Sequence, residues 1–164
     1  MELGALFPRS FSGYENFSGF GISGALEVKY NVQNNMNAGL KTDAVFMIIH
    51  KDNHAELLNF YFTYDYYFHY GNSRFSPFIG GGLGYYFGQF YQNDYYNAGI
   101  NRINNPTCFV RGGFEAGKFR LSLAYHLIRE KKEGYKRINY DYLSLSAGFY
   151  IGGGKWNRKY AGTL

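Results

Sequence analysis

Hydrophobic and polar residues alternate along most of this chain with a period of two. From Phe20 to Val32 the even positions carry mainly large apolar side chains, and the odd positions carry small, polar or charged ones. The same alternation returns at 36–48 and continues almost to the C-terminus. Because successive side chains of a β-strand point to opposite faces, the pattern predicts strands that each have one apolar face.

The alternating segments predict eight strands, with connections of two kinds. The strands are expected at 2–7, 19–32, 36–49, 57–70, 77–90, 107–117, 119–129 and 138–152. The connections 33–35, 71–76 and 117–118 are short, and 8–18, 50–56, 91–106 and 130–137 are longer. This arrangement indicates an all-β fold: an eight-stranded antiparallel up-and-down β-barrel with short turns at one end and longer loops at the other.

Two of the predicted hairpins can be placed in register. If the pair at 117–118 forms a type II′ turn, Glu115 lies opposite Arg120 on the polar face. In the same way, a turn centred on the middle of the earlier short connection places Glu27 opposite Lys41. Opposite charges would then face each other in both hairpins.

The size of the side chains decides which face of the barrel points outward. Alternation alone fits both a soluble barrel with an apolar interior and a membrane barrel with an apolar exterior. An eight-stranded barrel has an interior just wide enough to be filled by side chains. The many Phe, Leu, Ile and Tyr residues of the apolar parity have too large a total volume to fit inside it. The opposite parity consists mainly of Gly, Ala and Ser with a few tyrosines. We therefore expect a transmembrane β-barrel.

On the face made mainly of small residues, the positive and negative charges nearly cancel. An isolated buried ion costs several kcal/mol, so these residues are expected to pair within the lumen. The predicted charge network comprises Glu27, Lys29, Lys41, Asp43, Asp65, Arg111, Glu115 and Arg120, and Glu2 has the same parity.

Three segments resemble known membrane barrels. PFIGGGLGYYFG at 77–88 is similar to the glycine-alternating strand of small bacterial outer-membrane barrels, and ELGALFP with FSGFGISGALEVKY resembles their first two strands. The chain thus resembles barrels of the OmpX and OmpA-barrel type. The resemblance implies residence in a Gram-negative outer membrane, a signal peptide in the precursor that is absent from this sequence, and longer loops on the cell surface. Many members end on an aromatic residue, whereas here a barrel domain (1–152) precedes a basic tail (153–164).

Composition narrows the functional classes. A chain of 164 residues with 21% aromatic residues and 22 glycines fits one domain of many strands. The net charge is +5, but the basic residues are scattered, so nucleic acid is not an expected partner. The single Cys108 excludes an internal disulfide, and no sequence motif calls for a cofactor.

Candidate catalytic and metal-binding residues are few. His126 has polar parity, but the barrels that deacylate lipid A carry a Ser two residues after their His, and this chain has Ile128 there. No catalytic residue is therefore predicted. His50 and His54 flank Asp52 in a predicted loop, where such residues are usually solvated, so no metal site is expected.

The predicted loop 91–106 is the best candidate for binding a partner. It is rich in Tyr and Asn, a composition suited to adaptable contacts, and Tyr91, Tyr95, Tyr96 and Arg102 are its candidate contact residues. The sequence therefore favours a monomeric outer-membrane barrel with a polar, plugged lumen and a structural or surface-interaction role, in contact with membrane lipid and with an extracellular partner. Two alternatives stay open: an outer-membrane lipid-modifying enzyme, and a soluble barrel that binds a small hydrophobic ligand.

Overall fold

The structure is a computed structural model of the whole chain, and nearly all the residues that it describes lie in β-strands. It describes residues 1–8, 19–33, 35–50, 53–68, 75–94, 97–130, 138–139 and 141–150. The strands are β1 (Glu2–Pro8), β2 (Phe20–Gln33), β3 (Met36–His50), β4 (Asn53–Tyr67), β5 (Phe75–Asp94), β6 (Asn97–Ala116), β7 (Phe119–Glu130), β8 (Ile138–Asn139) and β9 (Tyr142–Phe149).

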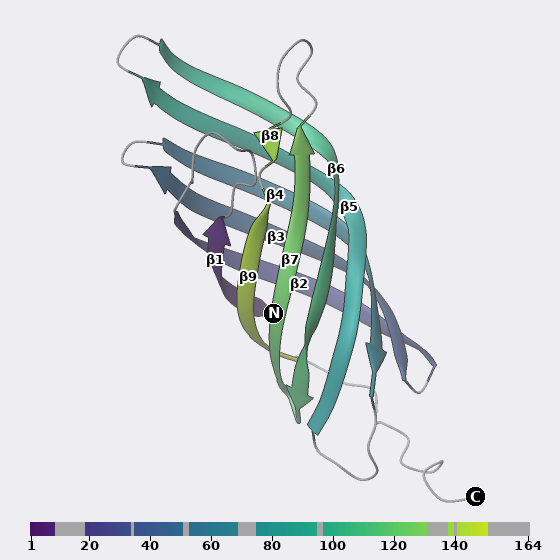
Figure 1. Cartoon of the computed structure of the whole chain (residues 1–164). Coiled ribbons are helices and arrows are strands. Elements are labelled where there is room, and N and C mark those ends of the chain that lie inside the picture. The colour runs from purple at the N-terminus through teal and green to yellow at the C-terminus, as the bar shows by residue number, and fades with distance from the viewer. Residues whose placement is uncertain are drawn as a thin grey trace, which may run out of the picture.

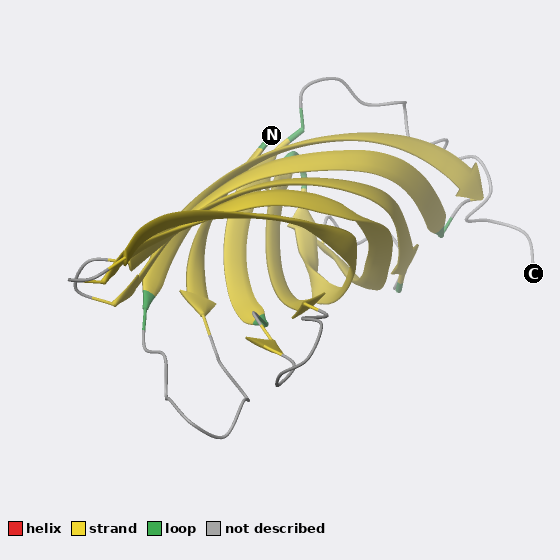
Figure 2. Cartoon of the chain, turned by 90° about the horizontal axis from the view of Figure 1, so that it is seen from above, coloured by secondary structure: helices red, strands yellow, loops and turns green. Residues whose placement is uncertain are grey.

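The strands close into an antiparallel barrel. Each strand from β1 to β6 pairs with the next one along the chain, and β9 pairs with both β7 and β1, which completes the ring. The short β8 also pairs with β7, so β8 and β9 are two pieces of one interrupted eighth strand. Figure 1 shows the strongly tilted strands, and Figure 2 shows their curvature from above. The predicted eight-stranded antiparallel barrel is confirmed.

Both predicted hairpin registers are confirmed. Glu115 pairs with Arg120, and Glu27 pairs with Lys41. Gly117 has a φ of 64°, and it is the only residue with positive φ in the described ranges. A positive φ at the first turn residue alone is the conformation of a type II′ turn, and glycine adopts it without a steric penalty.

The predictions of two of the longer loops are wrong. The connection predicted at 50–56 is reduced to 51–52, because β4 begins at Asn53. The loop predicted at 91–106 is instead a hairpin, in which β5 continues to Asp94, β6 starts at Asn97, and the two strands stay in register throughout. Asn, Gly and Tyr suggested a loop, but pairing along a neighbouring strand overrides weak local preferences.

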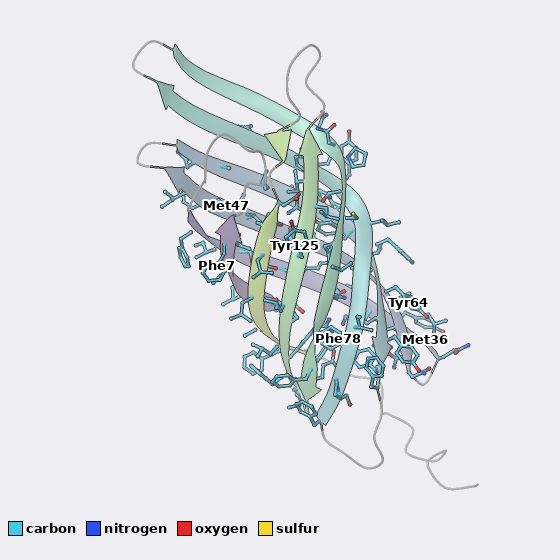
Figure 3. The ribbon with its side chains drawn as sticks, viewed as in Figure 1. Phe7, Met36, Met47, Tyr64, Phe78 and Tyr125 are labelled. Carbon is cyan, nitrogen blue, oxygen red and sulfur yellow. The ribbon has the colours of Figure 1, made fainter. Side chains whose placement is uncertain are left out.

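The large apolar side chains point outward. Leu26, Val28 and Leu83 are 60%, 78% and 72% exposed, whereas Tyr61 and Asp65 on the opposite face are almost fully buried. Figure 3 shows side chains projecting from the ribbon on both flanks of the barrel, among them Phe7 and Tyr64. The burial pattern is the opposite of what a soluble barrel with an apolar interior requires.

The apolar exterior has the height of a bilayer core. On β4 and its end, the outward residues from Leu58 to Phe68 are all apolar or aromatic and exposed. At about 3.3 Å per residue they cover about 33 Å along the strand. With a strand tilt of about 40°, the height is about 25 Å, which matches the outward apolar band of outer-membrane barrels. Within the described ranges, no helix is long and apolar enough to cross a membrane.

Candidate functional site

A network of ion pairs occupies the end of the lumen near the β2–β3, β4–β5 and β6–β7 turns. Asp65 lies at its centre and is 1% exposed. Its carboxylate accepts hydrogen bonds from Lys29 Nζ at 2.7 Å, Arg111 Nε at 2.8 Å and Arg120 Nη2 at 3.1 Å. Because a buried charge is tolerated only when it is paired and hydrogen-bonded, these contacts explain how Asp65 is accommodated.

Glu27 and Glu115 flank this centre and share its cations. Arg111 Nη2 donates to Glu27 Oε1 at 2.6 Å, and Arg120 Nη1 donates to Glu115 Oε1 at 2.7 Å. Lys29 Nζ lies 3.7 Å from Glu27 and 3.8 Å from Glu115. Each of the three cations therefore contacts more than one carboxylate.

Glu2 extends the network toward the middle of the barrel. Its Oε1 lies 3.2 Å from Arg120 Nε, and its Oε2 lies 3.4 Å from Lys41 Nζ. Lys41 Nζ is also 3.9 Å from Asp43. The structure thus brings all eight residues of the predicted charge network together, with Glu2 as the link between its two parts.

Aromatic rings line the same end of the lumen. The Tyr67 hydroxyl donates to Glu115 Oε1 at 2.6 Å, and the Tyr150 hydroxyl donates to the same oxygen. The guanidinium carbon of Arg120 lies 3.8 Å from the centre of the Phe78 ring, a cation–π distance. Tyr150 was not among the residues predicted for the charge network, although it follows Ser144, Ser146 and Gly148 on the inward parity.

Glycines on β5 make room for the large inward side chains of β4. A Cβ at Gly80 would collide with the Asp65 carboxylate, and a Cβ at Gly84 would lie 2.6 Å from Tyr61 Cδ1. Real Cβ atoms do not approach other atoms so closely. The small-residue parity of this strand therefore lets the charged and aromatic groups fill the lumen.

His126 occupies the middle of the lumen and is 2% exposed. Its Nδ1 lies 3.3 Å from the Tyr61 hydroxyl and its Nε2 lies 3.2 Å from Ser144 Oγ. The ring stacks on Tyr142 with the centroids 4.3 Å apart. A histidine next to a serine is part of a nucleophilic arrangement, but the second ring nitrogen here faces a tyrosine in place of an orienting carboxylate. The buried contacts make His126 a packing residue of the lumen.

The other end of the lumen is apolar, which corrects the expectation of a polar interior. A cluster of buried side chains fills it: Leu6, Val45, Met47, Ala55, Leu57, Tyr86, Ile128 and Tyr142. These residues lie near the β3–β4 hairpin and the upper ends of β1 and β7, and Figure 3 labels Met47 among them. Alternation did not reveal this cluster, because Val45-Phe46-Met47-Ile48 and Leu57-Leu58 are apolar on both parities and so do not show which side chains point inward.

The candidate contact residues fall in the β5–β6 hairpin rather than in a long loop. Tyr91 pairs with His54 and Ile100, and Arg102 pairs with Gln89. Tyr95 and Tyr96 lie outside the described residues. β7 accompanies β6 only from Thr107 onward, so in the described part of the chain residues 97–106 are paired along one edge only. Figure 1 shows this hairpin at the top of the barrel.

The candidate metal cluster cannot be assembled from the described residues. Asp52 and the His50 side chain lie outside them, and His54 packs near Phe46, with ring centres 5.9 Å apart. Among the described side chains no group of His, Cys, Asp and Glu could hold a metal ion. Cys108 is partly exposed and lies on the outward face, opposite Leu83. The basic tail at 153–164 also lies outside the described residues.

Comparison with known proteins gives matches in structure only. No protein-family model matches the chain, and no curated protein is similar to it in sequence. Among solved structures, Neisserial surface protein A (NspA) superposes with a TM-score of 0.62 at 16% identity, covering 89% of this chain and 92% of that one. The outer membrane enzyme PagL has a TM-score of 0.53 at 10% identity, covering 89% and 98%.

A third neighbour is the outer membrane protein OprG from Pseudomonas aeruginosa. Its TM-score is 0.50 at 14% identity, and the match covers 90% of this chain and 91% of that chain. At these identities the likeness concerns the fold. The chain therefore has the fold of the small eight-stranded bacterial outer-membrane β-barrels.

Proposed function

We propose that this protein resides in the bacterial outer membrane as a monomeric, non-catalytic barrel with a closed lumen, and that it presents the β5–β6 hairpin as an interaction surface. The apolar outer wall around a paired ion network carries this proposal, because the buried charges satisfy one another inside the barrel and lipid would solvate the apolar outer face. The fold shared with outer-membrane proteins supports the same location.

Residence in the membrane is tested by the solubility of the refolded chain. We expect a barrel that needs detergent or vesicles, and that migrates differently in SDS gels before and after boiling. A refolded chain that stays monomeric in buffer without detergent would contradict the proposal and favour a soluble carrier.

A closed lumen is supported by side chains that are buried at every level of the barrel. Arg120 and Asp65 block the end near the short turns, His126 the middle, and Ile128 and Tyr142 the far end. We therefore expect no stable ion currents in planar bilayers, since conducting barrels have about sixteen strands or more. Large steady single-channel currents from the purified protein would overturn this part.

The lipid-modifying alternative rests on the contact between His126 and Ser144. Both side chains face the lumen and are buried, so an acyl chain outside the barrel cannot reach them. Incubation of the protein with lipid A should leave its mass spectrum unchanged. Loss of an acyl chain with the wild type, but not with Ser144→Ala, would establish the enzyme instead.

The β5–β6 hairpin is suited to adding a strand from a partner. The edge of β6 from Asn97 to Pro106 has one charged residue, Arg102, and no Pro before its last residue, and its pairing with β5 has no bulge. Natural sheets usually protect free edges with several charges, prolines or bulges, and an edge with few of them is a template for an extended peptide. A partner with an extended, β-forming segment would fit here.

A second copy in the same membrane fits this edge poorly. Two barrels with the same orientation are related by an axis along the membrane normal, so strands tilted by about 40° would cross at about 80°. Neighbouring strands of a sheet differ by only about 20–25°. This geometry supports a monomer that binds an external partner.

The interaction surface can be tested by shortening the hairpin. A variant lacking residues 92–99, rejoined by an Asn-Gly turn, keeps every pairing of β6 with β7 and should fold as the wild type does. Peptides selected from a display library on the wild type should lose binding to this variant. Equal binding to both proteins would place the contact surface elsewhere.

A further inference from the structure

A groove of about 1030 Å³ crosses the outer wall of the barrel from β1 to β6. Gly24 and Ala44, which pair between β2 and β3, lie on its floor, and Leu3 and Leu58 flank them in the same lateral row of the sheet. Two small side chains between large ones leave a hollow in an otherwise bulky apolar wall. A hydrocarbon chain in this hollow gains close contacts that a flat wall does not offer.

Polar side chains from three neighbouring strands line the other end of the groove. They are Glu56 of β4, Gln89 of β5 and Asn104 of β6. Glu56 pairs with Gln89 and is the next outward residue beyond Leu58, where the apolar band of β4 begins. The groove therefore runs from the apolar band to its boundary on the side of the β5–β6 hairpin, which lies at the top of Figure 1.

This polar end offers hydrogen-bond acceptors without a fixed positive charge. The carboxylate of Glu56 is exposed and only accepts hydrogen bonds, whereas the carboxamides of Gln89 and Asn104 both accept and donate. Among the outward-facing strand side chains that the structure describes, there is no Lys or Arg. A phosphate group would therefore gain no ion pair here, while a hydroxyl or amide N–H group can donate to the carboxylate.

The outer leaflet of the proposed membrane supplies such donors. With the hairpins toward the cell surface, the polar end meets the outer leaflet of a Gram-negative outer membrane, which is built from acylated glucosamine glycolipid in place of phospholipid. The acyl chains of this glycolipid are joined to the sugar by amide and ester bonds and carry 3-hydroxyl groups. These hydroxyl and amide N–H groups lie at the top of the chains, at the boundary where Glu56 lies.

We propose that this groove binds an acylated glucosamine unit of the outer-leaflet glycolipid. One acyl chain lies over Gly24 and Ala44, and a 3-hydroxyl or amide N–H group at the top of that chain donates a hydrogen bond to the Glu56 carboxylate. This inference rests on the proposed membrane location and on the hairpins facing the cell surface. The contact depends on a hydrogen-bond donor of the lipid and not on its phosphate.

Two lipids that match in chain number and phosphate test this contact. The glycolipid 2,3-diacylglucosamine 1-phosphate with two 3-hydroxymyristoyl chains carries the donors, and dimyristoyl phosphatidic acid lacks them. The wild type, refolded in a mild detergent, is mixed with equal amounts of both lipids and analysed by native mass spectrometry. We expect about fivefold more bound glycolipid, which corresponds to about 1 kcal/mol for one hydrogen bond.

Substitutions at Glu56 separate the hydrogen bond from the rest of the groove. Glu56→Leu removes the acceptor and should bind the two lipids equally. Glu56→Gln keeps a carbonyl acceptor, so a preference of about twofold for the glycolipid should remain. Thr42→Val is the control, because Thr42 is a polar residue of the outer wall that lies outside this groove, and it should keep the wild-type preference.

Filling the hollow should weaken the binding of both lipids. A Cβ at Gly24 would have only Leu3 Cδ2 within 4 Å, at 3.9 Å, so the side chain of a Gly24→Leu variant has room to occupy the groove. We expect about threefold less of each bound lipid. Gly112→Leu is the matched control: Gly112 faces outward on β6 opposite Leu123, outside the groove, and a Cβ there would meet only Phe78 O, at 3.7 Å.

The gel-mobility assay separates failure of this site from failure of the proposed function. A variant with the wild-type mobility shift is folded, and Ala44→Leu replaces Gly24→Leu if the latter does not fold. A folded wild type that binds the two lipids equally, or a Glu56→Leu variant that keeps the fivefold preference, would overturn the site and leave the membrane location standing. A wild type that is soluble without detergent would defeat the location and the site together.

Discussion

The two ends of the lumen are filled by opposite chemistry within one barrel. Near the short turns, Asp65 and its partners form a continuous set of ion pairs, while near the β3–β4 hairpin Leu6, Met47 and Ile128 pack as an ordinary apolar core. Both ends are dry. The interior of a narrow barrel must be filled, and every polar group buried in it must be paired. Both paired ions and close-packed hydrocarbon meet these two requirements.

The two fillings differ in how they respond to a single change. A buried ion that loses its partner keeps its desolvation cost, whereas an apolar residue that is truncated leaves a cavity into which neighbours partly relax. Substitutions at the two ends should therefore differ in the size of their effect.

The largest effect is expected for Asp65→Ala. Lys29, Arg111 and Arg120 lose their common acceptor, so the free energy of unfolding should fall by about 3–5 kcal/mol. Urea titration of protein refolded into vesicles, followed by gel mobility, measures this. Lys118→Ala in the exposed β6–β7 turn serves as the control. A loss below about 1 kcal/mol, the value of a surface ion pair, would mean that the network does not hold this end together.

Ile128→Ala should have the next largest effect, about 2–4 kcal/mol, because it opens a cavity in the apolar cluster. Leu123→Ala, five residues earlier on the same strand but on the outer face, is the matched control. Lipid chains can fill the space that Leu123 vacates. The loss of unfolding free energy for Leu123→Ala should therefore be smaller than that for Ile128→Ala by at least about 1 kcal/mol. Equal losses in the same titration would argue that the upper lumen is loosely packed.

His126→Phe probes the boundary between the two ends. Phenylalanine can keep the stacking on Tyr142, but the hydroxyls of Tyr61 and Ser144 lose a partner. The expected loss of stability is about 1–2 kcal/mol. The titration should be repeated with Ser144→Ala in the same background; if the contact matters, the two losses will not be additive.

The smallest effect is expected for Gly117→Ala, in the exposed β6–β7 turn. Its φ of 64° disfavours any residue with a Cβ, at a cost of about 1 kcal/mol. Because a Cβ at position 117 would have no atom within 4 Å, the cost is confined to the backbone of the turn, and this loss should add to that of Asp65→Ala or Ile128→Ala. Strong non-additivity in the double variants would link the turn to the lumen.

Sequence reasoning located the charge network but not its contacts. Glu115 and Arg120 are paired in register and also joined by a 2.7 Å hydrogen bond. Glu27 and Lys41 are equally well registered, yet Glu27 bonds Arg111 and Lys41 lies near Glu2 and Asp43. Register follows from the turn and the parity of two strands, whereas the ion pairs of a closed barrel form across the lumen.

The amino-acid sequence by itself determined most of the strands, the outward direction of the large side chains on the apolar parity, and the inward position of the predicted charge network, because a period of two and the size of side chains act locally. Only the tertiary structure decided that Val45, Met47 and Leu57 close one end of the lumen, that the segment 91–106 continues two strands, and that Gly24 and Ala44 lie at the bottom of a groove. Each of these features depends on which strands become neighbours when the sheet curls and closes, since the curvature brings together residues far apart along the chain.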